Sequence, residues 1–141
     1  MGFFKDLKNK VTGGGATVRV TVPSARRGQP ISVKVQAQAK ANGKVSAVYL
    51  LIRATETCEF KDSDNNKQSA SKVSYENKVT IAGALDIVEG QSYNWEGVIE
   101  LPTNAQATFR GGLINHVWEV QAGLDMPGND PDSGWQAFDV H

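Results

Sequence analysis

The most constraining feature of this chain is a strict alternation of apolar and polar residues over residues 31–40. The apolar members of this segment are Ile31, Val33, Val35, Ala37 and Ala39. Successive side chains of a β-strand point to opposite faces, so this spacing gathers the apolar side chains on one face. In an α-helix the same residues would be distributed around the whole axis. The segment therefore predicts a long strand with one face on a core and the other in water.

The same two-residue period recurs along most of the chain, between stretches rich in glycine, proline, asparagine and aspartate. The strands expected from this pattern are residues 17–22, 31–40, 44–58, 73–82, 93–101, 115–126 and 135–140. About seven strands separated by frequent turns predict an all-β, antiparallel β-sandwich. A closed barrel is the alternative architecture.

Local features refine this arrangement. Asn42-Gly43 predicts a tight hairpin between its flanking strands, because both residues tolerate positive φ. The consecutive apolar residues 48–52 predict a strand covered on both faces for part of its length, or one with a β-bulge. Residues 61–72 are polar and predict a long exposed loop or a wide hairpin end. The strand over residues 31–40 is a candidate edge for pairing with another chain.

The first residues follow a different pattern, because their apolar side chains recur at the spacing of one helical face. Gly13, Gly14 and Gly15 would end such a helix. We therefore expect a short amphipathic helix over residues 1–12, followed by a single domain over residues 16–141. Apolar side chains beside lysines suit contact with a membrane surface or a partner, and packing on the domain is the simpler alternative. The residues proposed for that contact are Phe3, Phe4, Lys5, Leu7 and Lys8.

Composition argues against several classes of protein. The 141 residues include 15 basic and 15 acidic side chains, so no net charge attracts nucleic acid, and we expect no nucleic-acid partner. The single cysteine, Cys58, excludes an internal disulfide. No apolar run is long enough to span a membrane, and no signal-peptide pattern is present. We therefore expect a cytoplasmic protein, with peripheral contact at the inner membrane face if the N-terminal segment binds lipid.

No arrangement of residues matches a known catalytic motif, so we expect a non-enzymatic protein without catalytic residues or cofactors. His116 begins the apolar face of a strand, where a hydrogen bond to the backbone is the expected role. Cys58 lies near Glu56 and Glu59, which disfavour the thiolate, so a buried and inert cysteine is expected.

Two acidic loops offer oxygen atoms of the kind that Ca²⁺ binds. The first loop contains Asp62, Asp64 and Asn65, and the second contains Asp125, Asp130 and Asp132. Asp and Asn side chains more commonly form turns by hydrogen bonding to their own backbone. Turn formation is therefore the preferred interpretation of both loops, and we expect no metal.

Basic residues are concentrated in the first 60 residues, and acidic residues in the remainder. Arg26 and Arg27 lie together in the turn between the first two expected strands. This polarity favours contact with an acidic partner through that turn. An even distribution of both charges over solvated faces is the simpler alternative.

The segment from His116 to Phe138 resembles the closing strand of arrestin-like N-terminal domains, in which an aromatic-containing strand runs into an Asp-rich turn. The start of the chain is similar to that of bacterial sporulation-control proteins in the arrestin-like superfamily. Phe3 to Lys5 match their Phe-Phe-Lys segment, Gly13 to Gly15 their glycine step, and Arg27 to Pro30 their extended turn. Leu101-Pro102 also fits a strand-then-proline corner. The order and spacing of these motifs carry the resemblance, which covers most of the chain.

The resemblance implies an immunoglobulin-like β-sandwich of the arrestin N-terminal domain type. It also implies a regulatory or adaptor role through protein contacts. The family commonly has two such sandwiches in tandem, whereas residues 16–141 account for one. A stand-alone domain, a truncated form and one half of a dimer are therefore all consistent with the resemblance, and the expected partner is a different protein or a second copy.

A small-ligand or carbohydrate-binding sandwich is the alternative function, because surface tryptophans can form such sites. Strand parity predicts that Trp95 and Trp118 are buried, and Trp135, after a glycine turn, is expected to be half-exposed. Two tryptophans exposed on one face would favour the ligand-binding alternative.

Overall fold

The computed structural model describes residues 15–141, and in these residues the chain forms ten β-strands. The strands are β1 (Ala16–Thr21), β2 (Pro30–Ala39), β3 (Gly43–Val45), β4 (Ala47–Lys61), β5 (Lys67–Ala82), β6 (Leu85–Ile87), β7 (Ser92–Glu100), β8 (Phe109–Arg110), β9 (Ile114–Asp125) and β10 (Gln136–Phe138). The predicted all-β architecture is confirmed. The described residues contain no helix, so nothing supports the short N-terminal helix, which was predicted for residues outside the described range.

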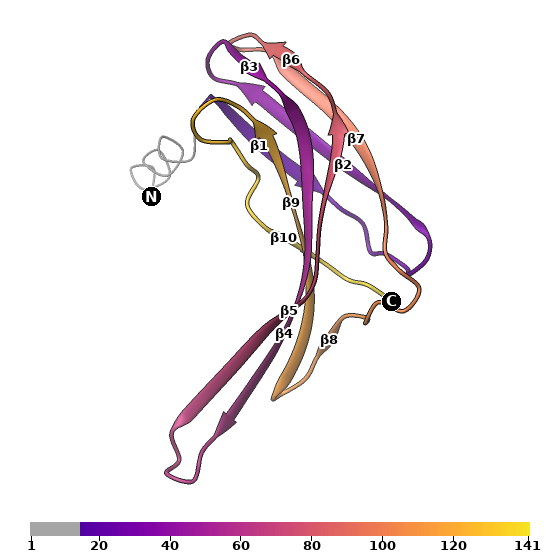
Figure 1. Ribbon diagram of the computed structural model, residues 1–141, viewed down its shortest axis with the longest axis vertical. Coiled ribbons are helices and arrows are strands. Elements are labelled where there is room, and N and C mark those ends of the chain that lie inside the picture. The colour runs from indigo at the N-terminus through magenta and orange to yellow at the C-terminus, as the bar shows by residue number, and fades with distance from the viewer. Residues whose placement is uncertain (1–14) are drawn as a thin grey trace.

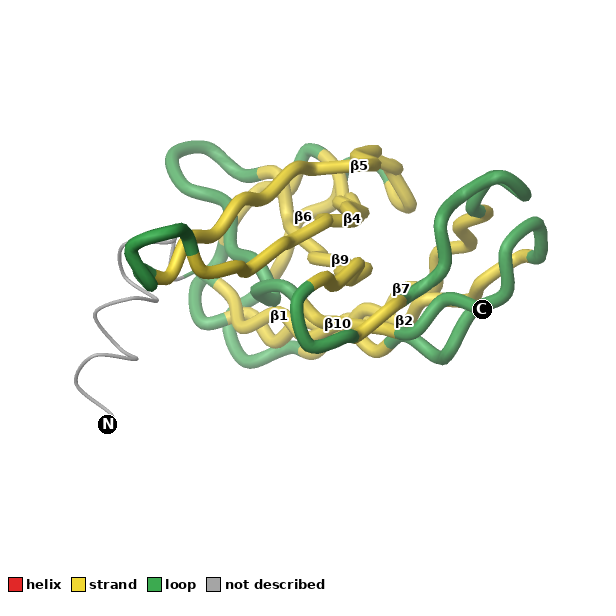
Figure 2. The backbone as a smooth tube through the Cα atoms, turned by 90° about the horizontal axis from the view of Figure 1, so that it is seen from below, coloured by secondary structure: helices red, strands yellow, loops and turns green. Residues whose placement is uncertain are grey.

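The strands form two main antiparallel sheets. One sheet has the order β1-β2-β7, and the other has the order β10-β9-β4-β5 with β8 paired to β9. The short strands β3 and β6 form a separate two-stranded ladder. In the view of Figure 2, β4 and β5 lie above β1, β2 and β7, as two layers of a sandwich. This arrangement is consistent with the predicted arrestin-like β-sandwich.

The core lies between the layers and follows from the alternation in the sequence. Along β2, residues alternate between exposed and buried without a break, and Val33 and Val35 are fully buried. The opposing sheet contributes Leu50 and Ile52 from β4 and Trp118 from β9. Burial of such side chains is the main favourable contribution to folding.

The predicted hairpin at Asn42-Gly43 is wrong. Strand β2 pairs with β1 on one edge and β7 on the other, so no edge remains for the strand that follows it. The chain instead passes through β3, which pairs with β6, to the opposite sheet. For the same reason β2 is a central strand, and the prediction that it offers a free edge to another chain is also wrong.

The apolar run over residues 48–52 is covered on both faces and also contains a β-bulge, so both of the predicted explanations apply. A register shift between Val48 and Tyr49 marks a bulge in the β4–β5 ladder, and both of these residues are buried. Tyr49 is accommodated because it lies against Gly123 of β9, where a Cβ atom would come within 2.4 Å of the tyrosine ring. Burial, followed by the hydrogen bond to Asp130, raises the pKa of Tyr49 well above its ordinary value.

The polar segment 61–72 is a hairpin end, but its turn is shorter than predicted. Strand β5 begins at Lys67, directly after the turn. Asp62 orders this turn, because one carboxylate oxygen accepts hydrogen bonds from the backbone N–H groups of Asp64 and Asn66 at 3.0 and 2.9 Å. The hydrogen bond from Asn66, together with those from Gln68 and Asp64, lowers the pKa of Asp62.

Candidate interaction site

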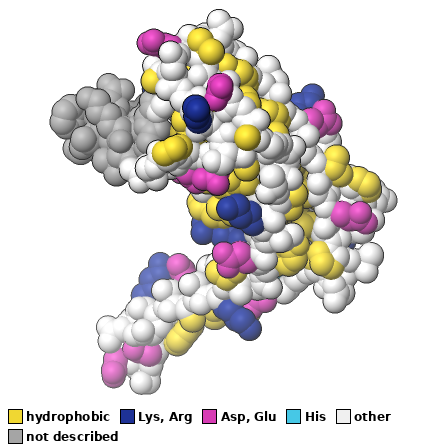
Figure 3. Space-filling view, turned by 45° about the horizontal axis from the view of Figure 1, so that its top comes forward, with side chains coloured by type: hydrophobic (Ala, Val, Ile, Leu, Met, Phe, Trp, Pro, Cys, Tyr) yellow, Lys and Arg dark blue, Asp and Glu magenta, His cyan; other side chains and the backbone are white. Residues whose placement is uncertain are grey.

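The outer half of the β4–β5 hairpin extends beyond the sandwich. We call residues 55–73 the arm. From Leu50 to Ala54, strand β4 is buried at alternate positions, and beyond Ala54 none of its residues is buried. The residues of β5 that belong to the arm are all exposed. Figures 1 and 3 show this hairpin standing away from the body of the molecule.

The strand register places a group of apolar side chains on one face of the arm and of the neighbouring β8–β9 turn. Cys58 pairs with Ile114, and Phe109 pairs with His116. Because side chains alternate along a strand, these residues share the face that carries Trp118 in the core. Phe60, Phe109 and Ile114 are 47%, 56% and 56% exposed. We call Cys58, Phe60, Phe109 and Ile114 the apolar strip.

The strip is exposed because the opposing layer ends above it. The last row in which both partners are buried contains Ala54 and Trp118. In the next row, His116 is 1% exposed, and its Nδ1 lies 3.0 Å from the carbonyl oxygen of Ala107. Below His116, no described element covers the face. The core face of the larger sheet therefore continues into solvent as the apolar strip.

Two exposed ion pairs lie on the face of these strands opposite to the strip. Lys67 Nζ lies 3.3 Å from Glu59 Oε2, and Arg110 Nη1 lies 2.8 Å from Asp139 Oδ1. Exposed ion pairs of this kind add at most about 1 kcal/mol to stability.

The two arginines proposed for an acidic partner have different surroundings. The guanidinium of Arg27 donates to the carbonyl oxygens of Ala105 and His141 at 2.9 and 3.3 Å, so this side chain joins three segments of the body. The side chain of Arg26 is exposed and makes no hydrogen bond or ion pair with the described residues. Arg26 is therefore the more accessible of the two for a partner. Phe3, Phe4, Lys5, Leu7 and Lys8 lie outside the described residues.

The acidic loops contain turn-forming carboxylates. Asp130 accepts hydrogen bonds from the Tyr49 hydroxyl and the Met126 backbone N–H at 2.9 and 3.1 Å. Asp132 accepts one from the backbone N–H of Gly134 at 2.9 Å. Within residues 15–141, no group of three His, Cys, Asp or Glu residues is arranged to hold a metal ion, and Asp125, Asp130 and Asp132 form no such group.

The tryptophans do not form a common surface. Trp118 is buried, as predicted, and its indole N–H donates to the carbonyl oxygen of Gln106 at 2.8 Å. Trp95 is half-buried rather than buried, because β7 is an end strand of its sheet. Trp135 is half-buried, as predicted, with the Arg53 guanidinium 3.8 Å from its ring centre.

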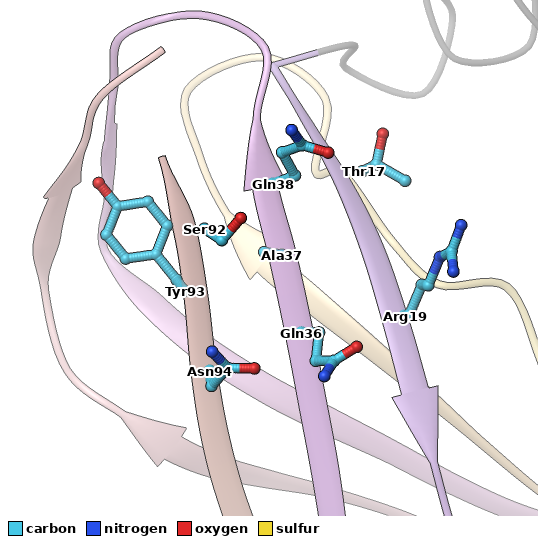
Figure 4. Close-up of a pocket in the computed structure, with 8 residues that line it drawn as sticks. All are labelled: Thr17, Arg19, Gln36, Ala37, Gln38, Ser92, Tyr93 and Asn94. Carbon is cyan, nitrogen blue, oxygen red and sulfur yellow. The ribbon is translucent and has the colours of Figure 1, made fainter. Parts of the chain in front are cut away.

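A shallow polar hollow lies on the outer face of the β1-β2-β7 sheet (Figure 4). Its volume is about 380 Å³, and its lining includes Arg19, Gln36, Gln38 and Asn94. These side chains alternate with the buried residues of their strands, so they occupy the solvent face that the sequence pattern predicts. The hollow contains no tryptophan and is most simply the concave surface of a twisted sheet.

The remaining sequence predictions concern His116 and Cys58. His116 bonds to the backbone as predicted, and its Nε2 also lies 2.6 Å from Ser74 Oγ. Cys58 is half-buried rather than buried, because it lies on the uncovered arm. The apolar strip was not anticipated from the sequence. The sequence feature that could have indicated the strip is the presence of two phenylalanines beside polar segments, Phe60 before Lys61 and Phe109 before Arg110.

Comparison with known proteins identifies the fold. No known family and no curated protein matches the sequence. The structure is similar to the crystal structure of Spo0M, a sporulation control protein from Bacillus subtilis, with a TM-score of 0.65 and 15% sequence identity. The similarity covers 91% of this chain and 50% of that chain, so the present chain spans half of Spo0M. At this identity the likeness shows the fold alone, an arrestin-like β-sandwich. Among the described residues, no helix has the length and apolar character needed to cross a membrane.

Proposed function

We propose that this protein is a non-enzymatic regulatory or adaptor protein that binds a protein partner through the apolar strip on its arm. The observation that carries the proposal is the continuation of the core face into solvent at Phe60, Phe109 and Ile114. Large exposed apolar side chains that cluster together commonly mark protein contact sites. The likeness to a sporulation control protein is in keeping with a regulatory role.

The test compares two double variants of the full chain as bait in cell extract. Phe60→Ser with Phe109→Ser removes apolar surface from the strip. Val88→Ser with Val98→Ser is the matched control, because these residues are 51% and 60% exposed but lie elsewhere. We expect a partner that is captured by the wild-type chain and by the control to be lost from the strip variant. Equal capture by both variants would refute the proposal.

Self-association through the same strip is a form of this function in which the partner is a second copy. Light scattering over a concentration series distinguishes the two forms. A mass near twice the 15.2 kDa of the chain, lost in the strip variant, indicates a dimer through the strip. A mass near 15.2 kDa at all concentrations indicates that the strip binds a different protein.

Two further contacts are proposed from the sequence. The N-terminal residues Phe3, Phe4, Lys5, Leu7 and Lys8 would contact a membrane surface or the partner at the inner face of a cytoplasmic membrane. Deletion of residues 1–12 should then abolish binding to liposomes, and unchanged binding would exclude this contact. Arg26 would contact an acidic surface of the partner. Arg26→Glu should weaken capture without lowering stability, because the side chain of Arg26 bonds to no described residue.

A further inference from the structure

A second concave site lies where the arm joins the sandwich. It is a cavity of about 410 Å³ between the base of the arm and the loop that follows β7. The volume is in the range of sites that bind small molecules. The cavity lies one row above the apolar strip, beside the buried His116, and none of the residues of the strip lines it.

The floor of the cavity is aromatic. Tyr75 and Trp118 line it, and their ring centres are 5.2 Å apart at a tilt of 48°. Trp118 is 1% exposed and is fixed by its hydrogen bond to Gln106, so it supports the half-buried ring of Tyr75, which is the aromatic surface of the floor. A rigid aromatic surface offers apolar contact at little cost in conformational entropy.

The walls of the cavity carry polar side chains that have no partner among the described residues. Glu56 and Lys72 lie opposite each other on β4 and β5, and Asn104 and Gln106 line the loop wall. None of these four side chains forms a hydrogen bond or an ion pair with the described residues. The cavity therefore presents both donors and acceptors, on two opposite walls, to whatever enters it.

The hydroxyl of Ser74 adds an acceptor. His116 Nδ1 faces the Ala107 carbonyl oxygen, so in the neutral imidazole this nitrogen carries the proton and Nε2 is the acceptor. Ser74 Oγ then donates to Nε2 over 2.6 Å, a shorter contact than the 3.3 Å to the Ala54 carbonyl oxygen. With its proton engaged, Ser74 presents its oxygen lone pairs to the cavity.

The loop wall is preorganised. The carbonyl oxygens of Ala105, Gln106 and Ala107 accept hydrogen bonds from Arg27, Trp118 and His116, respectively. A wall that is fixed before binding loses little entropy when a ligand enters.

These observations define the ligand by its chemistry. One negative and one positive side chain line the cavity, so neither an anion nor a cation is favoured by net charge. Hydrogen-bonding groups on both walls suit a ligand with polar groups around its periphery, and the half-buried ring of Tyr75 suits one with an apolar face. We propose that this cavity binds a neutral, hydroxyl-rich ligand, a single sugar unit or a disaccharide.

The experiment measures saturation transfer by NMR from the full chain to added sugars at millimolar concentration. The probes are methyl α-mannoside, N-acetylglucosamine and maltose. Alanine and sodium acetate serve as zwitterionic and anionic comparisons. The test variant is Asn104→Ala with Gln106→Ala, and the matched control is Gln36→Ala with Asn94→Ala in the hollow of Figure 4. All four side chains are exposed, and thermal unfolding confirms that each variant is folded.

We expect transfer to at least one sugar, with an affinity about tenfold weaker in the test variant and unchanged in the control. Three outcomes would overturn the proposal: transfer to none of the three sugars, transfer only to alanine or acetate, or a loss confined to the Gln36 and Asn94 variant. The proposal is independent of partner binding, because the test variant leaves the apolar strip intact. Partner capture is therefore expected to be the same for this variant and the wild-type chain.

Discussion

The two halves of the β4–β5 hairpin show what burial adds to a strand ladder. Both halves belong to one antiparallel pairing that runs from Val48 and Ala82 to Lys61 and Lys67. In the half inside the sandwich, alternate β4 residues such as Leu50 and Ile52 are buried against the opposing layer. In the arm, the same ladder continues without a covering layer. The difference indicates that the inner half determines stability, whereas the side chains of the arm are available for contacts.

The largest expected effect is the loss of the aromatic side chain of β9 that pairs with the inner half at Ala54. Trp118→Ala should lower the free energy of unfolding by about 3–5 kcal/mol, because Trp118 is 1% exposed and its removal leaves a cavity. Phe60→Ala in the arm should change it by less than about 0.5 kcal/mol. Chemical denaturation measures both variants. A comparable loss for the two would mean that the arm is part of the cooperative core.

A smaller effect is expected where the two layers meet at the inner half of β5. A Cβ atom at Gly97 of β7 would lie 2.5 Å from Ile81 Cγ2. Gly97→Ala should therefore lower the free energy of unfolding by about 1–3 kcal/mol through overpacking. Gly83→Ala is the control, because nothing lies within 4 Å of a Cβ atom there. Equal effects of the two substitutions would show that β7 does not lie as close to β5 as described.

Tyr49 should give a smaller, pH-dependent effect. Its pKa is raised in the folded state, so its contribution to stability is present below the ordinary tyrosine pKa of about 10 and is lost as pH rises through the folded value. At neutral pH, Tyr49→Phe should cost about 1 kcal/mol, through the lost hydrogen bond to Asp130. In an ultraviolet titration, Tyr49 should ionise above the ordinary tyrosine range, and Tyr49→Phe should remove that step. Ionisation of Tyr49 near pH 10 would contradict this environment.

The smallest expected effect is at the tip of the arm. The lowered pKa of Asp62 means that its hydrogen bonds are present above the ordinary carboxyl pKa of about 4 and are lost as pH falls through the folded value. The amide NMR signals of Asp64 and Asn66 should shift over that window, with little change in global stability. Asp62→Asn should remove the shift. If the amide signals still shifted in this variant, a group other than Asp62 would be responsible.

Much of the fold was predictable, because the two-residue period reports directly which face of a strand is buried. The alternation in β2 and the long apolar face of β9 each correspond to an observed strand. The error at Asn42-Gly43 has a physical reason. A turn signal shows that the chain can reverse locally, but the pairing of β2 with both β1 and β7 depends on contacts far along the chain.

The candidate site was less predictable than the fold. Phe60 and Phe109 are distant in sequence, and only the pairing of β4 and β8 with β9 brings them to the same face. The cavity at the base of the arm likewise depends on the loop after β7 lying over Trp118. Sequence patterns identified Trp118 as a core residue, but they contain no information on which loop covers it.

The most direct test of the proposed contact surface places a photo-crosslinking amino acid in the full-length chain at position 60 or, as a control, at position 98. Phe60 lies on the apolar strip, and Val98 is similarly exposed on β7. After irradiation in cells, the account predicts a discrete crosslinked protein, or a crosslinked second copy, from position 60 and none from position 98. Crosslinking from position 98 alone would show that the partner binds the sandwich rather than the arm.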